Sequence, residues 1–543
     1  MTQSQTLIII CALVDTPDFI IVGAGSAGCA LAYRLSENPN NRVLLLEAGP
    51  ADWSPYIHVP AAIIKAVGNP SLDWCHLAEP DPSRGGRVDL WPAGKALGGS
   101  SSINGMLFVR GQADDYDAWA RLGNKGWAYA DVLPYFKRME TFAAGDAAVR
   151  GQDGPLNVAH LRTRHKMGDV FVKAALESGL AFNPDYNGVS QEGASFPQVT
   201  QKRGWRYSAS RAYLWRTKGR KNLTIKTGVT ARRLLFDGKI CMGVEAEHRG
   251  KIVQFRAARE VVLSSGALGS PKLLMLSGIG PGADLRKLGL PVLVDNPHVG
   301  AHLLDHPQGM VSIDVNVRTY NVDVNSPRIL WYMARWLLLG DGPAASPYPH
   351  AVAFFKSSPE KPKPDVQVML GPFAFDFSPK GIVPYLKPAV TAAFNVTLPN
   401  NPGRLRLRSG DPAAPPIIEH SLYASADDMR TTVTAGRFIR KIFQSDAFKP
   451  YLLAERLPGP SVQTDAEWEE YLRRTSFLGY HPVSTCRMGR MGEAVVAPDL
   501  KVHGIDHLRV VDASIMPTLV SGNTNGASIM IGERAADFIL EAS

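Results

Sequence analysis

Three glycines near the N-terminus have the spacing of a dinucleotide-binding turn. Gly23 permits a tight turn, Gly25 lets the backbone approach a pyrophosphate, and Gly28 lets a helix pack against a strand. A helix starting here would offer free N–H groups and partial positive charge to phosphates. Glu47 follows at a distance that suits hydrogen bonds to ribose hydroxyls. The pattern indicates FAD, NAD or NADP without distinguishing among them.

A second glycine-rich segment, residues 94–111, contains Gly98 and Gly99 followed by three consecutive serines, residues 100–102. Their backbone N–H and hydroxyl groups could surround a phosphate or the edge of a flavin. Taken alone, the segment is equally consistent with an ordinary Ser/Gly loop.

The chain has 13 histidines, and any one of them is more often structural than catalytic. Histidine nevertheless suits proton transfer, because its ordinary pKa of about 6.5 lies near neutral pH. His302 and His306 stand at i, i+4, which could place two metal ligands side by side. We find no acidic or thiol ligand to complete such a set and predict no metal site.

The elements around these residues predict an α/β fold. A strand at residues 18–22, a helix at 29–35 and a strand at 42–47 form a βαβ unit, which makes the first glycine pattern specific. Further buried strands are expected at residues 259–266 and 507–512, and a helix at 527–540. Residues 320–475 differ, being rich in proline and aromatic residues, with strand-like segments at 366–370 and 393–398.

This organisation predicts a discontinuous Rossmann-like FAD-binding domain with an inserted α+β substrate-binding domain that carries an antiparallel sheet. We assign residues 18–160, 215–320 and 476–543 to the first domain and residues 161–214 and 321–475 to the second. Residues 1–17 are an appended segment. Phe373, Phe375 and Phe377 alternate, and they could line an apolar pocket or pack in a core.

Composition excludes several classes of protein. The chain has 543 residues, of which 45% are hydrophobic, and a net charge of +9. Its charges are interspersed, so we expect no nucleic-acid partner. The apolar run at residues 7–14 is too short to span a bilayer, and the run at 329–339 is interrupted by Arg335, so we expect no stable membrane insertion. Five cysteines without a CxxC pair suit a reducing compartment and predict a cytoplasmic protein.

Four blocks together resemble the glucose–methanol–choline (GMC) oxidoreductase family. They are residues 94–111, the segment GALGSPKLLMLSGIG at 266–280, HPVSTCRMG at 481–489, and residues 511–532, which include VDASIMP and GNTNGASIMI. The blocks occur in the family's order, and the resemblance runs from residue 18 to the end. Within this family, the overall sequence pattern most resembles that of bacterial FAD-dependent sorbose, choline and alcohol dehydrogenases.

The resemblance implies FAD and oxidation of a CH–OH group to an aldehyde or ketone, by hydride transfer to flavin N5. His481 matches the family's general base and Asn523 its partner. The cofactor-binding residues that the matched positions imply are Gly23, Gly25, Ser26, Ala27, Gly28, Glu47, Ala48, Gly94, Leu97, Gly98, Gly99, Ser100, Asn104, Gly105, Met106, Val229, Asp512, Ala513, Asn523 and Thr524. A helix starting after Asn525 and Gly526 would place its N-terminus near the flavin's pyrimidine end.

Three positions differ from the family, and one of them, Ala497, replaces an acid common in its loop with no mechanism that we can attach to the change. Ile103 stands where some members carry a histidine that links FAD covalently, so we expect non-covalent FAD. His302 stands where asparagine is usual, which puts the local hydrogen bonding in doubt. The partners implied are a small-molecule alcohol and an electron acceptor, either oxygen or a quinone or artificial acceptor, with a dehydrogenase preferred to an oxidase. A lyase or photodecarboxylase on the same scaffold is the alternative.

Overall fold

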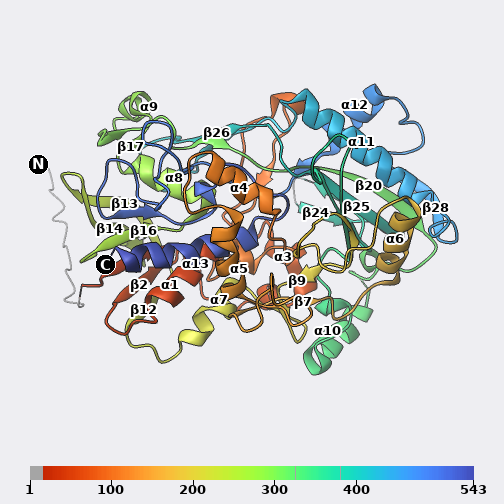
Figure 1. Cartoon of the computed structure of the whole chain (residues 1–543), viewed down its shortest axis with the longest axis horizontal. Helices are drawn as coiled ribbons and strands as arrows, with labels where there is room; N and C mark the ends of the chain where they lie inside the picture. Colours follow the sequence, from red (N-terminus) through yellow and green to blue (C-terminus); the bar gives the residue numbers. More distant parts are fainter. Residues whose placement is uncertain (1–15, 325, 379–380, 543) are drawn as a thin grey trace, which may run out of the picture.

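The computed structural model describes residues 16–324, 326–378 and 381–542, so the prediction for the first 15 residues falls outside the described residues. Two sheets dominate the structure. Figure 1 shows a parallel sheet with its helices on the left and a larger antiparallel sheet on the right. This arrangement confirms the predicted combination of a Rossmann-like part and an antiparallel sheet. None of the helices in the described ranges is long and apolar enough to cross a bilayer.

The parallel sheet has five strands, and each pair of neighbours is parallel. The order is β12 (Leu223–Lys226), β2 (Val43–Leu46), β1 (Phe19–Val22), β16 (Glu260–Leu263) and β30 (Leu508–Val510). The runs FIIV and VLLL in β1 and β2 are fully buried, as expected for strands covered on both faces. The strands predicted at residues 259–266 and 507–512 are therefore neighbours in this sheet.

Helix α1 (Ser26–Leu35) follows β1 directly, and α13 (Asn525–Glu541) packs along it. Gly532 of α13 allows this approach, because a Cβ there would lie 2.4 Å from the carbonyl oxygen of Ala27. The helix predicted at residues 527–540 thus begins two residues earlier, at Asn525. The packing brings the N-termini of two helices from opposite ends of the chain to one place, where Asn525 donates to Ser26 Oγ at 2.7 Å.

The antiparallel sheet lies beside the parallel one. Its order is β28 (Leu452–Leu457), β20 (Pro307–Val315), β25 (Ala389–Val396), β22 (Val366–Gly371), β21 (Ala351–Phe355) and β8 (Gly193–Ser195), and β29 (Phe477–Leu478) also pairs with β20. Helices α11 (Ala426–Phe443) and α6 (Lys166–Glu177) pack against it. β20 and β29 lie outside the predicted segment 321–475, and the domain boundaries stay a prediction.

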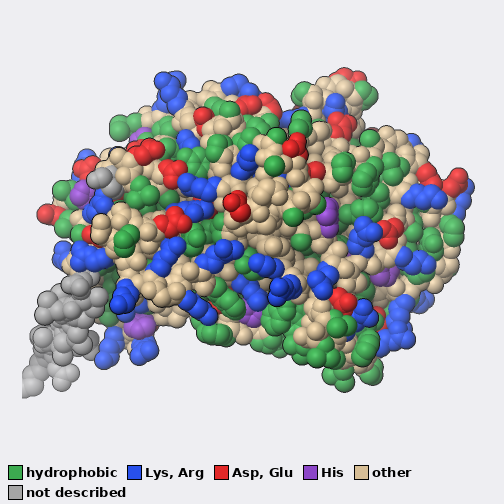
Figure 2. All heavy atoms as spheres, turned by 60° about the horizontal axis from the view of Figure 1, so that its bottom comes forward, with side chains coloured by type: hydrophobic (Ala, Val, Ile, Leu, Met, Phe, Trp, Pro, Cys, Tyr) green, Lys and Arg blue, Asp and Glu red, His purple; other side chains and the backbone are tan. Residues whose placement is uncertain are grey.

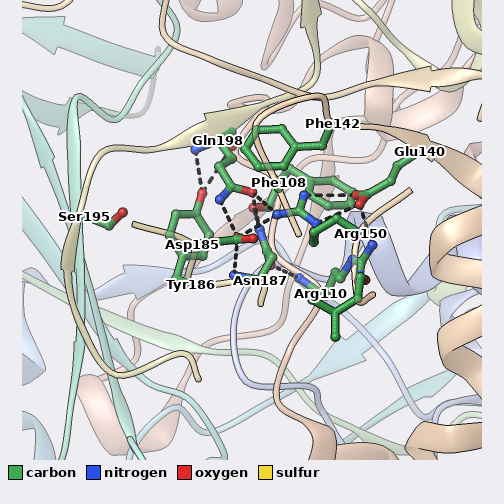
Figure 3. Close-up of polar contacts among 12 residues, drawn as sticks. Phe108, Arg110, Glu140, Phe142, Arg150, Asp185, Tyr186, Asn187, Ser195 and Gln198 are labelled. Carbon is green, nitrogen blue, oxygen red and sulfur yellow. Dashed lines mark hydrogen bonds and ion pairs between the residues drawn. The ribbon is translucent and has the colours of Figure 1, made fainter. Parts of the chain in front are cut away.

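A buried ionic network anchors the chain that follows the second glycine-rich segment (Figure 3). Glu140 is fully buried and accepts from Nε of Arg150 at 2.7 Å and from Nη2 of Arg110. Arg150 also donates to Asp185 at 2.6 Å, and the Arg110 backbone N–H donates to Asn187 at 2.7 Å. Burial lowers the pKa of Arg110. Glu140 pairs with both guanidiniums, whereas Asp185 pairs with Arg150, so Arg110 depends most on Glu140.

We expect Glu140→Gln to lower the free energy of unfolding by about 3 kcal/mol, because it leaves the buried Arg110 guanidinium without its counter-ion and Arg150 with Asp185 in place of two carboxylates. Urea unfolding followed by circular dichroism would measure the loss. Asp427→Asn is the control, because its ion pair with Arg430 is exposed and should contribute about 1 kcal/mol at most. Equal stabilities for the two variants would contradict this account of the network.

Candidate active site

A cavity of about 2380 Å³ reaches from the C-terminal end of β1 to the antiparallel sheet. Most of the residues predicted from the sequence line it. They are Gly23, Gly25, Ser26, Ala27, Glu47, Ala48, Gly94, Gly99, Ser100, Asn104, Gly105, Met106, Val229, His481, Asp512, Ala513, Asn523 and Thr524. Gly28, Leu97 and Gly98 are not part of this lining. Which of these residues touch a cofactor stays a prediction.

Each glycine at the turn after β1 is required for a different physical reason. Gly23 has φ +106°, and a Cβ there would lie 2.4 Å from the carbonyl oxygen of Ser264. A Cβ on Gly28 would lie 2.0 Å from the carbonyl oxygen of Gly23. At Gly25, by contrast, a Cβ would meet no described protein atom closer than 3.7 Å. Gly25 lines the cavity, so its small size leaves room for a group in the cavity, which fits the approach of a pyrophosphate.

Glu47 has a second task that the sequence did not reveal. Its carboxylate accepts from the backbone N–H groups of Ala24 and Gly49, each at 2.9 Å, so it holds the glycine turn in place. Burial raises its pKa to about 7, against the lowering effect of these hydrogen bonds. Glu47 also lines the cavity, so the predicted contact with a ribose is compatible with its position.

The second glycine-rich segment packs directly on the first. It contains the 3-10 helix η3 (Gly99–Ser102), and a Cβ on Gly99 would lie 2.7 Å from Cα of Gly25. Gly94 is equally constrained, because its Cβ would lie 2.2 Å from the carbonyl carbon of Gly99. Ile103 is buried in a small apolar cluster with Ile57 and borders the cavity. The two motifs, far apart in sequence, thus form one continuous wall.

His481 and Asn523 meet at the wall of the same cavity. His481 follows β29, and Asn523 lies just before α13. Asn523 Nδ2 donates to His481 Nε2 at 2.9 Å, and Asn523 Oδ1 accepts from Gln367 Nε2 on β22 at 3.0 Å. The structure therefore brings together the two residues that the sequence paired.

His306 is a member of the site that the sequence analysis did not assign. Its Nε2 lies 2.8 Å from the carbonyl oxygen of Thr397, and its Nδ1 lies 2.9 Å from Nδ1 of His481. His302 lies elsewhere, stacked on His298 with ring centroids 5.9 Å apart, so the i, i+4 spacing does not form a pair. His302 has φ +59°, a left-handed conformation that the family's usual asparagine adopts readily.

The hydrogen bonds of His306 determine the proton position on His481. A carbonyl oxygen only accepts, so Nε2 of His306 carries its proton, and in the neutral ring Nδ1 is an acceptor. His481 must then donate from its own Nδ1, which leaves the lone pair on Nε2. Burial lowers the pKa of His306 to about 4 and lowers that of His481, so both rings are neutral at pH 7. His481 Nε2 is consequently unprotonated, and its lone pair accepts from Asn523 Nδ2 at the cavity wall.

Asp305, His306 and His481 hold ligand atoms within 4.8 Å of one another, a grouping that the sequence analysis overlooked. The facing Nδ1 atoms already bond to each other, and Asp305 Oδ1 accepts from the backbone N–H of His481 at 2.8 Å. Burial raises the pKa of Asp305 to about 7. These groups serve as a brace for the loop of His481, and we do not assign a metal to them.

Phe373 and Phe375 line the cavity, as the pocket interpretation predicts. The side chain of Phe377 lies outside the described residues.

Comparisons with known proteins identify the family of this chain. The N-terminal model of the GMC oxidoreductase family matches residues 17–308, and its C-terminal model matches residues 399–532. An oxygen-dependent choline dehydrogenase of Rhizobium johnstonii is 42% identical over 530 residues, covering 96% of this chain and 95% of the relative. The mitochondrial choline dehydrogenase of Mus musculus is 39% identical, covering 97% of this chain and 89% of the relative.

Solved structures show the same fold. The pyridoxine 4-oxidase from Mesorbium loti has a TM-score of 0.87 at 31% identity, covering 96% of this chain and 99% of the other. A formate oxidase variant of Aspergillus oryzae RIB40, described with FAD modification, has a TM-score of 0.90 at 27% identity and covers 97% and 98%. The chain belongs to the GMC oxidoreductase family and is an FAD-dependent enzyme that oxidises CH–OH donors.

Proposed function

We propose that this enzyme oxidises an uncharged alcohol to the aldehyde or ketone, with His481 as the general base. The observation that carries the proposal is the position of His481 Nε2, unprotonated and 2.9 Å from Asn523 Nδ2 at the cavity wall. Bound FAD supplies the acceptor for the hydride that leaves the alcohol carbon. The lyase and photodecarboxylase alternatives draw no support from the relatives reported above, which are named as dehydrogenases or oxidases.

Three side chains of this protein have separate roles in removing the proton from the alcohol. His481 Nε2 takes the hydroxyl proton, which makes the adjacent C–H a better hydride donor. When the alcohol hydroxyl reaches His481 Nε2, Asn523 Nδ2 exchanges its bond to that nitrogen for one to the alcohol oxygen and holds it beside the base. His306 keeps His481 in the correct tautomer and acts as a positioning residue, because it contacts the base rather than the substrate.

The substrate class follows from the face of the antiparallel sheet beside the base. Gln308, Asn395 and Gln367 form one row across β20, β25 and β22. The next row on the same face consists of Met310, Ala393 and Met369, and Phe477 packs against Met310 and Ala393. All four of these apolar residues line the cavity. An alcohol held at His481 would extend its carbon chain over this apolar row.

Choline is the substrate that the names of the relatives suggest, but it carries a fixed positive charge. A quaternary ammonium group over Met310, Ala393 and Met369 would lose water at a row without a carboxylate, and the cavity carboxylate Asp376 belongs to another element, β23 (Phe375–Ser378). Alcohols of the same shape without the charge should therefore be preferred.

An anaerobic comparison of choline with 3,3-dimethylbutan-1-ol would test this function, because the two alcohols differ chiefly in charge. We expect bleaching of the flavin absorbance by both octan-1-ol and dimethylbutanol. The second-order rate constant for dimethylbutanol should exceed that for choline by roughly tenfold or more. A preference for choline would overturn the substrate class alone. Failure of every alcohol to bleach the flavin would overturn the function.

We propose that FAD is held without a covalent bond to this segment, because Ile103 offers no nucleophile. Precipitation of the holoenzyme with acid should leave the yellow colour in the supernatant. Colour that stays in the protein pellet would overturn this expectation.

A further inference from the structure

Helix α10 (Arg328–Leu339) projects from the lower edge of the molecule in Figure 1. Its inner face packs normally: Trp336 is buried against Val59, Ala344 and Ala345. Tyr332 and Met333 pack against the same cluster. A helix on a protein surface usually has polar residues on the face opposite its buried contact.

The outer face of α10 is apolar instead. Leu330 is 74% exposed, Trp331 65% and Leu338 82%, and Leu337 and Leu339 are also exposed. Leu330, Ala334 and Leu338 stand four residues apart, so they form one stripe on the side opposite Trp336. Figure 2 shows apolar side chains gathered at the lower right, where α10 lies in Figure 1. The fold does not require this stripe, because the contact with the protein uses the other face.

Cations border the apolar stripe. Arg328 begins α10 and is exposed. At the other end, Arg162 donates to the carbonyl oxygen of Leu339 at 3.2 Å, and the backbone of Arg203 lies against Gly340. Lys202, beside Arg203, is also exposed. Blue Lys and Arg side chains lie next to the patch in Figure 2.

The cavity of the active site opens beside this helix. Ile329, Tyr332 and Met333 of α10 belong to its lining, and Ile329 is also 43% exposed. A surface that contacted the apolar stripe would therefore lie next to the entrance. Because α10 contributes to both the apolar stripe and the cavity lining, apolar molecules that enter the cavity would pass beside this helix.

We propose that α10 docks the enzyme on the surface of an anionic phospholipid bilayer, with the cavity mouth next to the lipid. An apolar stripe with tryptophan and leucine, bordered by arginine and lysine, has the composition of a helix that lies in a membrane interface. The leucines would enter the boundary between headgroups and acyl chains, and the cations would meet lipid phosphates. Such docking is peripheral and needs no spanning helix.

The test uses the full-length holoenzyme and sedimentation with vesicles. We expect the protein to sediment with vesicles of phosphatidylcholine mixed with phosphatidylglycerol. It should bind less well to phosphatidylcholine alone or at high salt, because salt screens the cations. The variant Leu330→Asp with Leu338→Asp should bind about tenfold more weakly or worse. Leu453→Asp is the matched control, because Leu453 is 65% exposed on β28 and should leave binding unchanged.

Flavin content and the rate of flavin reduction by octan-1-ol should be the same in both variants and in the parent, which shows that the fold is intact. Vesicle binding by the double variant at the parent's level would overturn the proposal. So would a parent that stays in the supernatant with anionic vesicles. A third outcome would also overturn the proposal. If neither protein binds vesicles, and the parent forms a dimer that the double variant does not form, the stripe contacts a second copy of the chain.

Discussion

His481→Ala should retain its FAD and lose about 10²–10⁴-fold in turnover at neutral pH, because the variant has no base to take the hydroxyl proton. His481 does not belong to the wall that Gly23, Gly25 and Gly99 form, which is the predicted phosphate-binding part, so cofactor content should stay near the parent's value. Stopped-flow reduction of the flavin under anaerobic conditions would measure the loss directly, without a contribution from the electron acceptor.

The pH dependence distinguishes a lost base from a damaged site. Burial lowers the pKa of His481 below its ordinary value of about 6.5, so the ring stays neutral and active as the pH falls to 6.5. Activity of the parent should fall only at a lower pH, where His481 becomes protonated. His481→Ala should instead gain activity as the pH rises, because alkoxide then forms without a base.

His298→Ala is the control for this experiment. His298 bonds through Nε2 to the carbonyl oxygen of Gly492 at 3.0 Å and is not part of the cavity lining, so its loss should leave the reduction rate unchanged. A His481→Ala variant with a near-normal rate at neutral pH would remove His481 from the mechanism.

The parts of the site that the sequence predicts well are those built from consecutive residues. The turn at Gly23 to Gly28 depends on a strand, a tight turn and a helix that are adjacent in the chain, so its form can be read locally. The parallel strands could be predicted for the same reason, since a short run such as FIIV, rich in β-branched residues and followed by a glycine turn, favours a buried strand.

The parts that the sequence does not predict depend on contacts between distant segments. His306 has its role only because β20 pairs with β29, which places it against His481. The apolar row of Met310, Ala393 and Met369 depends in the same way on the register of β20, β25 and β22, because a shift of one residue would turn another set toward the cavity. The apolar run at residues 329–339 was considered only as a spanning segment, and its exposure is a property of the packed structure.

Asn523→Ala should slow flavin reduction by about 10²–10³-fold while leaving the cofactor bound. Asn523 is positioned by two partners, since Gln367 donates to its Oδ1 and its Nδ2 points at His481 Nε2. The amide N–H is thus already oriented toward the place where the alcohol oxygen must lie to reach the base. Removing one such donor costs about 2.7–4 kcal/mol in the transition state, where negative charge grows on the oxygen.

The neighbouring Asn525→Ala is the matched control for Asn523→Ala, because both changes shorten an asparagine at the start of α13. Asn525 bonds to Ser26 Oγ rather than to His481, so its loss should affect the contact between α1 and α13 and leave the reduction rate within a few-fold of the parent. Rapid mixing of each variant with octan-1-ol, without oxygen, gives both the limiting rate and the apparent affinity. We expect the loss in Asn523→Ala mainly in the limiting rate, because the contact strengthens as the proton leaves. An unchanged limiting rate would mean that Asn523 only begins the helix and that the alcohol oxygen is held by another group.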